Sequence, residues 1–121
     1  MPYINEWKEK GLHRTFTGDI SGKEVLIANL NVQGDARFDE IDYILNDFSQ
    51  IDSFNISEFH VSEVSTMDNV AAQVNNKFKI IIVATDEGFL KFVDMYLTQM
   101  KDSLIDCVVF HDMESALNSI S

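Results

Sequence analysis

The sequence contains few cysteines, prolines and basic residues. Its 121 residues include one cysteine, one proline, and nine lysines and arginines against twenty aspartates and glutamates. A single cysteine cannot form a disulfide within the chain, which is consistent with a reducing compartment. No apolar run is long enough to span a bilayer, and no apolar stretch follows a charged N-terminus. We therefore expect a cytoplasmic protein that does not associate with membranes.

The charge balance argues against nucleic acids as partners. The formal net charge is −11, and a surface this acidic repels the phosphate backbone of nucleic acids. Hydrophobic residues make up 45% of the chain, as in ordinary globular domains. The length favours a single domain with a core of its own.

The N-terminal part predicts a hairpin followed by a helix. Tyr3–Lys8 and Leu12–Thr17 both alternate in hydropathy and are joined by a short turn, which indicates two antiparallel strands. Ser21 and Glu24 have the spacing of a capping box, so a helix is expected to begin there. Gly34 is the expected end of that helix.

A strand, a polar loop and a long helix are expected next. Ile41–Phe48 is the predicted strand, and Asn46–Ser57, which contains three serines and two aspartates, is the predicted loop. Asn55 and Glu58 resemble a capping box at the start of the helix. The expected buried face of that helix comprises Ile56, His60, Val64, Met67, Ala71 and Val74.

The C-terminal part continues the alternation. Phe78–Ala84 is almost continuously apolar, as in a central strand that is covered on both faces. Asp86 is expected to open a helix, Ile105–Phe110 to form another strand, and Asp112–Ile120 to form a closing helix. The expected inward face of the helix after Asp86 comprises Phe89, Val93, Tyr96 and Met100. Strands alternating with helices predict an α/β fold.

No catalytic, metal or cofactor site is expected from the motifs. His13, His60 and His111 fall on different predicted elements without the spacing of metal ligands. The sequence contains neither a glycine-rich phosphate loop nor a GxSxG nucleophile motif. Cys107 lies in an apolar run, which favours a small buried side chain over a reactive thiol.

Arg37 has two possible roles. It lies among acidic residues within Gly34–Glu40. Its guanidinium could bind an anion in a ligand-contacting loop. Alternatively, it pairs with Asp35, Asp39 or Asp47 and fixes the entry of the chain into the following strand.

The serine-rich segment Asn46–Ser57 also has two interpretations. Loops at the carboxyl ends of strands and the N-termini of helices often bind ligands, so Arg37, Asp47 and Ser53 are candidate ligand-binding residues. A phosphoryl group on Ser53 or Ser57 would lie near the positive end of the next helix, which makes both serines candidates for regulatory phosphorylation. In the alternative interpretation, these polar residues only satisfy backbone N–H groups at the helix start.

Six segments resemble those of a known family. The chain is similar to the bacterial SpoIIAA-like proteins, small members of the STAS and CRAL-TRIO-like fold group. The similar segments are FTGDISGKE (Phe16–Glu24), GDARFD (Gly34–Asp39), NDFS (Asn46–Ser49), MDNVAA (Met67–Ala72), IIIVATD (Ile80–Asp86) and VVFHDMESAL (Val108–Leu117).

This resemblance implies a fold and a kind of function. The fold would be a single SpoIIAA-like domain over residues 1–121, with a mixed five-stranded sheet and about four helices. Anti-sigma-factor antagonists of this fold group carry a phosphorylatable serine in an Asp-Ser-x-Gly loop. Asp52 and Ser53 occupy a similar place, although Phe54 and Asn55 replace the last two residues of that motif.

The expected function is a non-enzymatic regulatory module that acts through a protein partner or as a homodimer. One alternative is a domain that binds a small molecule or a lipid-like ligand. A second alternative is an enzyme in which Asp47 and either His13 or His60 act as base and acid, which requires a hydrogen bond between them.

Overall fold

The order of the strands along the chain is also their order in the sheet. The computed structural model describes residues 3–120 and places β1 to β5 side by side in one five-stranded sheet. β1 is antiparallel to β2, and every later neighbour is parallel. The elements are β1 (Tyr3–Trp7), β2 (Gly11–Ser21), α1 (Gly22–Gln33), the 3₁₀ helix η1 (Ala36–Glu40), β3 (Tyr43–Asn55), α2 (Glu58–Val74), β4 (Lys79–Val83), α3 (Glu87–Gln99), β5 (Cys107–Phe110) and α4 (Met113–Asn118). This arrangement confirms the predicted α/β fold with an N-terminal hairpin and a mixed sheet.

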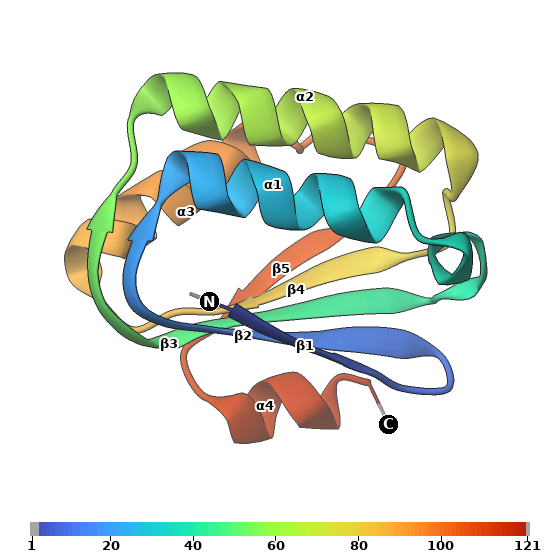
Figure 1. Ribbon diagram of the computed structural model, residues 1–121, viewed down its shortest axis with the longest axis horizontal. Coiled ribbons are helices and arrows are strands. Elements are labelled where there is room, and N and C mark those ends of the chain that lie inside the picture. Colours follow the sequence, from blue (N-terminus) through green and yellow to red (C-terminus); the bar gives the residue numbers. More distant parts are fainter. Residues whose placement is uncertain (1–2, 121) are drawn as a thin grey trace.

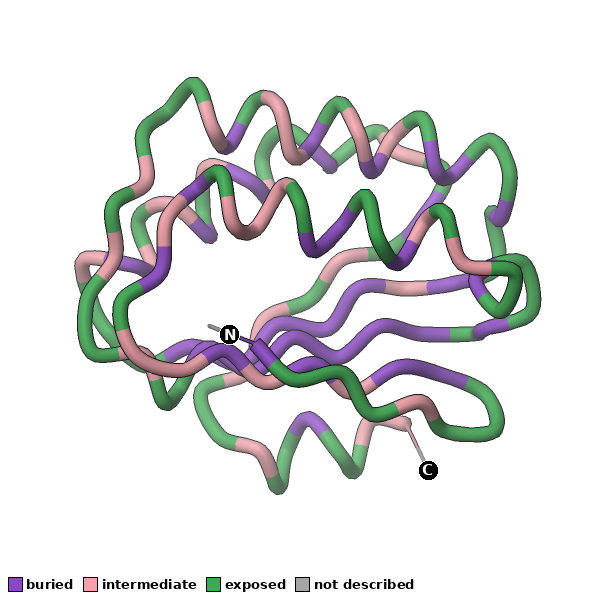
Figure 2. The backbone as a smooth tube through the Cα atoms, in the orientation of Figure 1, coloured by how far each residue is buried: buried purple, intermediate pink, exposed green. Residues whose placement is uncertain are grey.

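Helices cover both faces of the sheet, but unequally. α1, α2 and α3 lie over one face, and α4 lies under the other (Figure 1). Alternation along β3 sends Ile44 and Phe48 into the larger core beneath α1–α3, and Tyr43 and Leu45 into the smaller core with Ala116 of α4. The central strands are accordingly buried along most of their length (Figure 2). None of the helices within residues 3–120 combines the length and the apolar character needed to cross a membrane.

β2 and β3 are longer than the sequence indicated. Their ends rise out of the sheet towards the starts of α1 and α2 (Figure 1). The pairing of the two strands shifts register between Thr15 and Thr17 and again after Gly18, which has a left-handed φ of 71°. The predicted loop Asn46–Ser57 is therefore mostly strand, because β3 continues to Asn55.

The helix boundaries of α1 and α3 follow the local signals. Ser21 and Glu24 form the expected capping box, and α1 is capped at its C-terminal end by Gly34. The side chain of Asp86 accepts a hydrogen bond from the N–H of Phe89 at the start of α3. The predicted inward residues of this helix, Phe89, Val93, Tyr96 and Met100, are all buried.

The start of α2 differs from the prediction. The cap is Ser57 rather than Asn55, and the third residue of the capping box is His60 rather than Glu58. The Ser57 N–H donates to Nδ1 of His60 at 3.1 Å. Histidine can take the place of glutamate here because its ring nitrogen is also an acceptor.

The buried face of α2 was predicted only in part, since Ala71 is buried as expected. The structure buries Val61, Ser65, Asp68, Ala71 and Ala72. Val74, which was expected to be inside, is 69% exposed. The apolar pattern misplaces the face because two of the buried side chains are polar and find their partners on other helices.

Candidate functional site

A cavity of about 80 Å³ lies between the sheet and helices α1–α3, partly open to solvent. The first turns of α1 and α2 contribute to it, at the end of the molecule where β2 and β3 rise. Its walls are mostly apolar and include Val25, Phe48, Val61, Val64, Ile82 and Phe89. Protein interiors are usually packed without voids of this size, so the cavity is a candidate binding site.

The sheet contributes a polar floor to the cavity. Arg14 on β2 lies between the inward-facing Leu12 and Phe16 and is only 3% exposed. Its Nε donates to Oδ1 of Asn46, its direct neighbour on β3, at 2.8 Å. Its Nη2 donates to Oδ1 of Asn29 on α1 at 2.5 Å. Nη1 is buried and has no hydrogen-bond partner within the described part of the chain.

Asp68 on α2 is the second charged group of this network. Its Oδ1 accepts hydrogen bonds from Nδ2 of Asn29 at 3.2 Å and from Nε2 of Gln33 at 3.1 Å. Its Oδ2 accepts a hydrogen bond from Oη of Tyr96 on α3 at 2.6 Å. Burial raises the pKa of Asp68 to about 6, although the bond from Tyr96 and the charge of Arg14 act in the opposite direction.

Asn29 connects the two charged groups. Its amide oxygen accepts from Arg14 while its amide nitrogen donates to Asp68. Burial lowers the pKa of Arg14 to about 10, and the charge of Asp68 limits that decrease. Arg14 is therefore still a cation at neutral pH, inside a largely apolar region.

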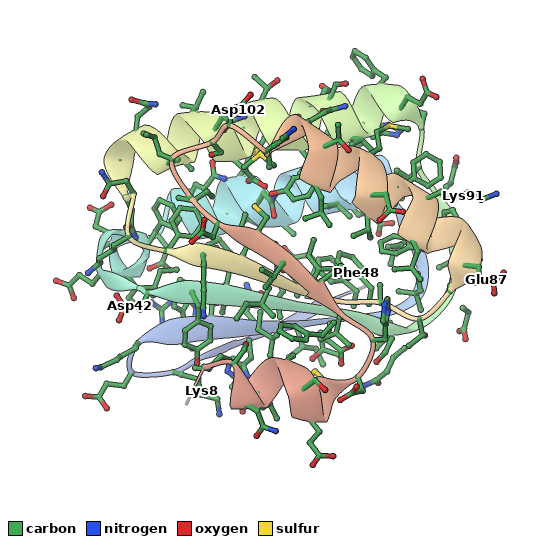
Figure 3. All side chains as sticks on the ribbon, turned by 180° about the vertical axis from the view of Figure 1, so that it is seen from behind. Lys8, Asp42, Phe48, Glu87, Lys91 and Asp102 are labelled. Atoms are coloured by element: carbon green, nitrogen blue, oxygen red, sulfur yellow. The ribbon has the colours of Figure 1, made fainter. Side chains whose placement is uncertain are left out.

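Phe48, Phe89 and Phe92 form one wall of the cavity and belong to a larger cluster of aromatic rings. The rings of Phe16 and Phe48 stack with centroids 4.4 Å apart and planes 11° apart. Phe48 also contacts Phe89 of α3 at 4.7 Å, and Figure 3 shows Phe48 between the sheet and that helix. Phe54 extends the cluster to Phe89 and Phe92. These contacts fix the distance between β3 and α3 on this side.

His60 borders the cavity at the start of α2. Its ring lies so close to Gly22 of α1 that a Cβ on Gly22 would overlap it. Because Nδ1 accepts the Ser57 N–H, a neutral His60 carries its proton on Nε2. Ser57 is thus the N-cap of α2, and its phosphorylation stays a prediction.

Arg37 does not line the cavity. It lies in η1, an element that the sequence did not predict, and its side chain is 58% exposed. Nε and Nη2 donate to the two carboxylate oxygens of Asp35 at 3.0 and 2.8 Å. The guanidinium lies over the ring of Trp7, 4.1 Å from its centroid. These bonds lower the pKa of Asp35 to about 2, and they match the structural interpretation of Arg37.

Asp47 and Ser53 are not brought together with Arg37. Asp47 is buried and accepts hydrogen bonds from the N–H and Oγ of Ser49 at 2.9 and 2.6 Å. Ser53 donates to Oδ1 of Asp19 across the β2–β3 pair at 2.6 Å. Arg37 precedes β3 and Ser53 lies near the far end of this thirteen-residue strand. The serine is thus presented on a strand rather than in a loop, and its phosphorylation stays a prediction.

The pairs required by the acid–base hypothesis are not formed. Nε2 of His13 lies 2.9 Å from the hydroxyl of Tyr43, and His60 is bonded to Ser57. Asp47 has its own partner, as described above. No group of three or more His, Cys, Asp or Glu side chains converges on a possible metal position within residues 3–120.

The polar residues of the cavity floor were not among the site residues predicted from the sequence. One signal for Arg14 was available, because a charged residue occupies the inward position between Leu12 and Phe16 of an alternating strand. Asn29 and Asp68 gave no comparable signal, because polar residues on a helix are usually solvated.

Solved structures similar to this chain share its fold. The structure of the anti-sigma factor antagonist SpoIIAA in its unphosphorylated form has a TM-score of 0.64 at 10% identity, over 98% of this chain and 96% of that one. An anti-sigma factor antagonist from Mycobacterium paratuberculosis has a TM-score of 0.67 at 10% identity, over 98% and 92%. An uncharacterized DUF3478-family protein with a SpoIIAA-like fold from Shewanella loihica has a TM-score of 0.56 at 14% identity, over 98% and 92%.

Comparisons of sequence give no match, either to a family model or to a curated protein. The likeness is therefore one of architecture, carried by the hairpin, the parallel strands and the helices on both faces. The chain has the SpoIIAA-like fold.

Proposed function

We propose that this protein is a non-enzymatic binding domain whose cavity takes a small molecule with an apolar body. The single observation behind the proposal is the cavity of about 80 Å³ with apolar walls and a buried polar floor. A ligand site typically combines apolar walls with a few placed polar groups, and this cavity has both. A water molecule occupies about 30 Å³ in the liquid, so only a few non-hydrogen atoms fit inside, and a longer ligand would extend through the open side.

The hydrogen bonding around the cavity supports binding rather than catalysis. The carboxylate of Asp68 is occupied by three donors, and Tyr96 is one of them. Nδ1 of His60 is occupied by the Ser57 N–H. A general base or nucleophile needs a free, activated atom directed at substrate, and these atoms are engaged with protein groups.

Xenon is a suitable probe because it enters small apolar cavities without requiring a charged partner. We expect xenon to shift the amide NMR signals of residues that line the cavity. Val64→Phe, which places a ring in the cavity, should abolish these shifts. Val70→Phe is the matched control, because Val70 lies on the same helix and is 63% exposed. Absence of xenon shifts in the wild-type protein would refute the proposal.

A second candidate function is regulatory contact with a protein partner or a second copy of the chain. It is favoured by the shared fold with two anti-sigma factor antagonists. Phe59 at the start of α2 is 69% exposed and is the largest exposed apolar side chain among the described residues. If it contributes to self-association, the mass measured by light scattering should change from dimer to monomer in Phe59→Ser. A wild-type protein that is strictly monomeric at high concentration would remove the homodimer from this candidate.

A further inference from the structure

The guanidinium of Arg14 is a buried cation without a direct counter-ion. It donates to two amide oxygens, those of Asn46 and Asn29, and both amides are neutral. No carboxylate of the described chain lies within ion-pair distance of it. Buried charges in proteins are normally paired directly, because the cost of desolvating an unpaired charge is several kcal/mol.

Asp68 does not fill this role, although it is the nearest acidic group of the network. All three of its hydrogen bonds come from uncharged donors on α1 and α3. Asn29 separates it from Arg14 by donating to one group and accepting from the other. Asp68 thus reduces the cost of the buried cation at a distance but leaves Nη1 of Arg14, with its two N–H bonds, unpartnered.

We infer that the ligand of the cavity is a short-chain aliphatic monocarboxylate whose carboxylate pairs with Arg14 while its hydrocarbon chain packs against the apolar walls. This inference rests on the proposed function. Arg14 lines the cavity together with Phe48, Val64 and Phe89, so the cation and the apolar surfaces belong to one space. A guanidinium binds a carboxylate with charge-assisted hydrogen bonds, which are stronger than those to a neutral group.

The single charge of a monocarboxylate and the small number of free donors in the cavity floor favour a monocarboxylate over other anions. Only one nitrogen of Arg14 has no hydrogen-bond partner, and the amide nitrogen of Asn29 already donates to Asp68. A phosphate dianion would bring a second negative charge and more acceptor atoms than this floor can satisfy. A monocarboxylate brings a single charge, and its chain needs no polar partner.

Butyrate and butyramide test the inference on the intact protein. They have nearly the same shape, but only butyrate is charged. We expect butyrate to bind at least about tenfold more tightly than butyramide in NMR titrations, because only the carboxylate forms an ion pair with the guanidinium. Sodium chloride should keep the ionic strength equal in both titrations, since the acidic protein responds to salt.

Two arginine variants test whether the preference for butyrate depends on Arg14. Arg14→Met, which keeps the length of the side chain without its charge, should weaken butyrate binding about tenfold and butyramide binding much less. Arg37→Met is the matched control, because Arg37 is exposed and pairs with Asp35 outside the cavity. If Arg14→Met does not fold, the wild-type comparison of the two ligands still decides the question.

Each outcome supports or overturns a distinct claim. Equal binding of butyrate and butyramide would overturn the role of Arg14 but leave the proposed binding function intact. Inorganic phosphate that binds as tightly as butyrate would overturn the choice of a monocarboxylate. If neither organic ligand binds while xenon enters the cavity, the inference fails and the cavity takes another class of molecule. If xenon is also excluded, the proposed function fails with it.

Discussion

Asp68 carries its carboxylate into the interior, where neutral donors offset the loss of water only in part. Its folded pKa is about 6, whereas its ordinary value is 3.8. This difference corresponds to about 3 kcal/mol of destabilisation at neutral pH. The titratable groups that face it are Arg14 on β2, Tyr96 on α3 and, through Tyr96, Cys107 on β5.

The direction of the pH effect depends on whether the folded or the unfolded state binds the Asp68 proton more tightly. Between about pH 4 and pH 6 the folded state holds a proton on Asp68 that the unfolded chain has released. The contribution of Asp68 to stability is therefore most favourable below about pH 4, falls as the pH rises through this window, and is least favourable above about pH 6. This is opposite to the behaviour of a carboxylate whose pKa is lowered by an ion pair.

Asp68→Asn tests this effect. The asparagine keeps an acceptor for Tyr96 but cannot ionise. We expect the difference in unfolding free energy, variant minus wild type, to decrease by about 2 kcal/mol between pH 7 and pH 4. Urea denaturation at a series of pH values measures it, and the subtraction cancels the titration of other carboxylates. A difference that does not vary with pH would show that Asp68 has an ordinary pKa.

Cys107 is expected to react slowly with thiol reagents. Burial raises its pKa to about 12, compared with an ordinary value of 9.0, and its Sγ lies 3.9 Å from Oη of Tyr96. Only the thiolate reacts, so the folded protein should be modified about a thousandfold more slowly than the urea-unfolded chain near pH 7. The rate of reaction with Ellman's reagent measures this difference. Equal rates in the folded and unfolded protein would contradict it.

At the scale of elements, the start of α1 depends on its capping box. Oγ of Ser21 accepts from the N–H of Glu24, and Oε1 of Glu24 accepts from the N–H of Ser21. Ser21→Ala should lower the unfolding free energy by about 1 kcal/mol, because the N–H of Glu24 loses its acceptor. Thr66→Ala, at an exposed position within α2, should change it by less than about 0.5 kcal/mol. Urea denaturation of both variants makes the comparison, and equal effects would argue against the cap.

The contacts of Phe48 with Phe16 and Phe89 are expected to hold α3 against the sheet. Phe48 is stacked on Phe16 and contacts Phe89, so its removal eliminates both contacts at once. Phe48→Ala should lower the unfolding free energy by about 3–5 kcal/mol and enlarge the cavity beside it. Leu104→Ala removes an apolar side chain from a position that is 59% exposed and should have an effect below about 0.5 kcal/mol. Similar losses in the two variants would show that the stacked rings contribute little.

Features that depend on residues close together in the sequence could be predicted, and features that depend on distant residues could not. The cap of α1 and the inward face of α3 depend on residues three or four positions apart, and both were predicted correctly. The buried face of α2 depends on Asp68, whose partners Asn29 and Tyr96 are 39 and 28 positions away. The length of β3 also depends on a distant partner, because its final residues pair with the end of β2.

The residues of the candidate site could not be predicted from the sequence for the same reason. The sequence drew attention to Arg37 because it lies among acids, yet those acids include its own permanent partner, Asp35. Arg14 lies among uncharged neighbours and was not recognised, although the absence of an adjacent acid is what leaves its Nη1 without a partner. For a ligand site, an unpaired charge is more informative than a dense cluster of charges.

At the scale of the whole molecule, the chain combines a formal net charge of −11 with few compensating contacts. The ion pairs within residues 3–120 are Lys8–Glu6, Arg37–Asp35 and Lys77–Asp42, and all of them are at the surface. Surface ion pairs contribute little to stability. Repulsion among the many acids should therefore dominate the electrostatic free energy of the folded state.

Salt should accordingly stabilise the protein. The Debye length shortens from about 30 Å at 0.01 M to about 8 Å at 0.15 M ionic strength, so added sodium chloride screens repulsion across most of the surface. We expect the midpoint of thermal unfolding to rise over this range, since the folded state holds the acids closer together than the unfolded chain does. A variant with Glu9→Gln, Asp52→Asn and Asp102→Asn, which removes three exposed negative charges, should respond less to salt. A midpoint that falls as salt is added would mean that attractive pairs, rather than the net negative charge, govern the electrostatics of this fold.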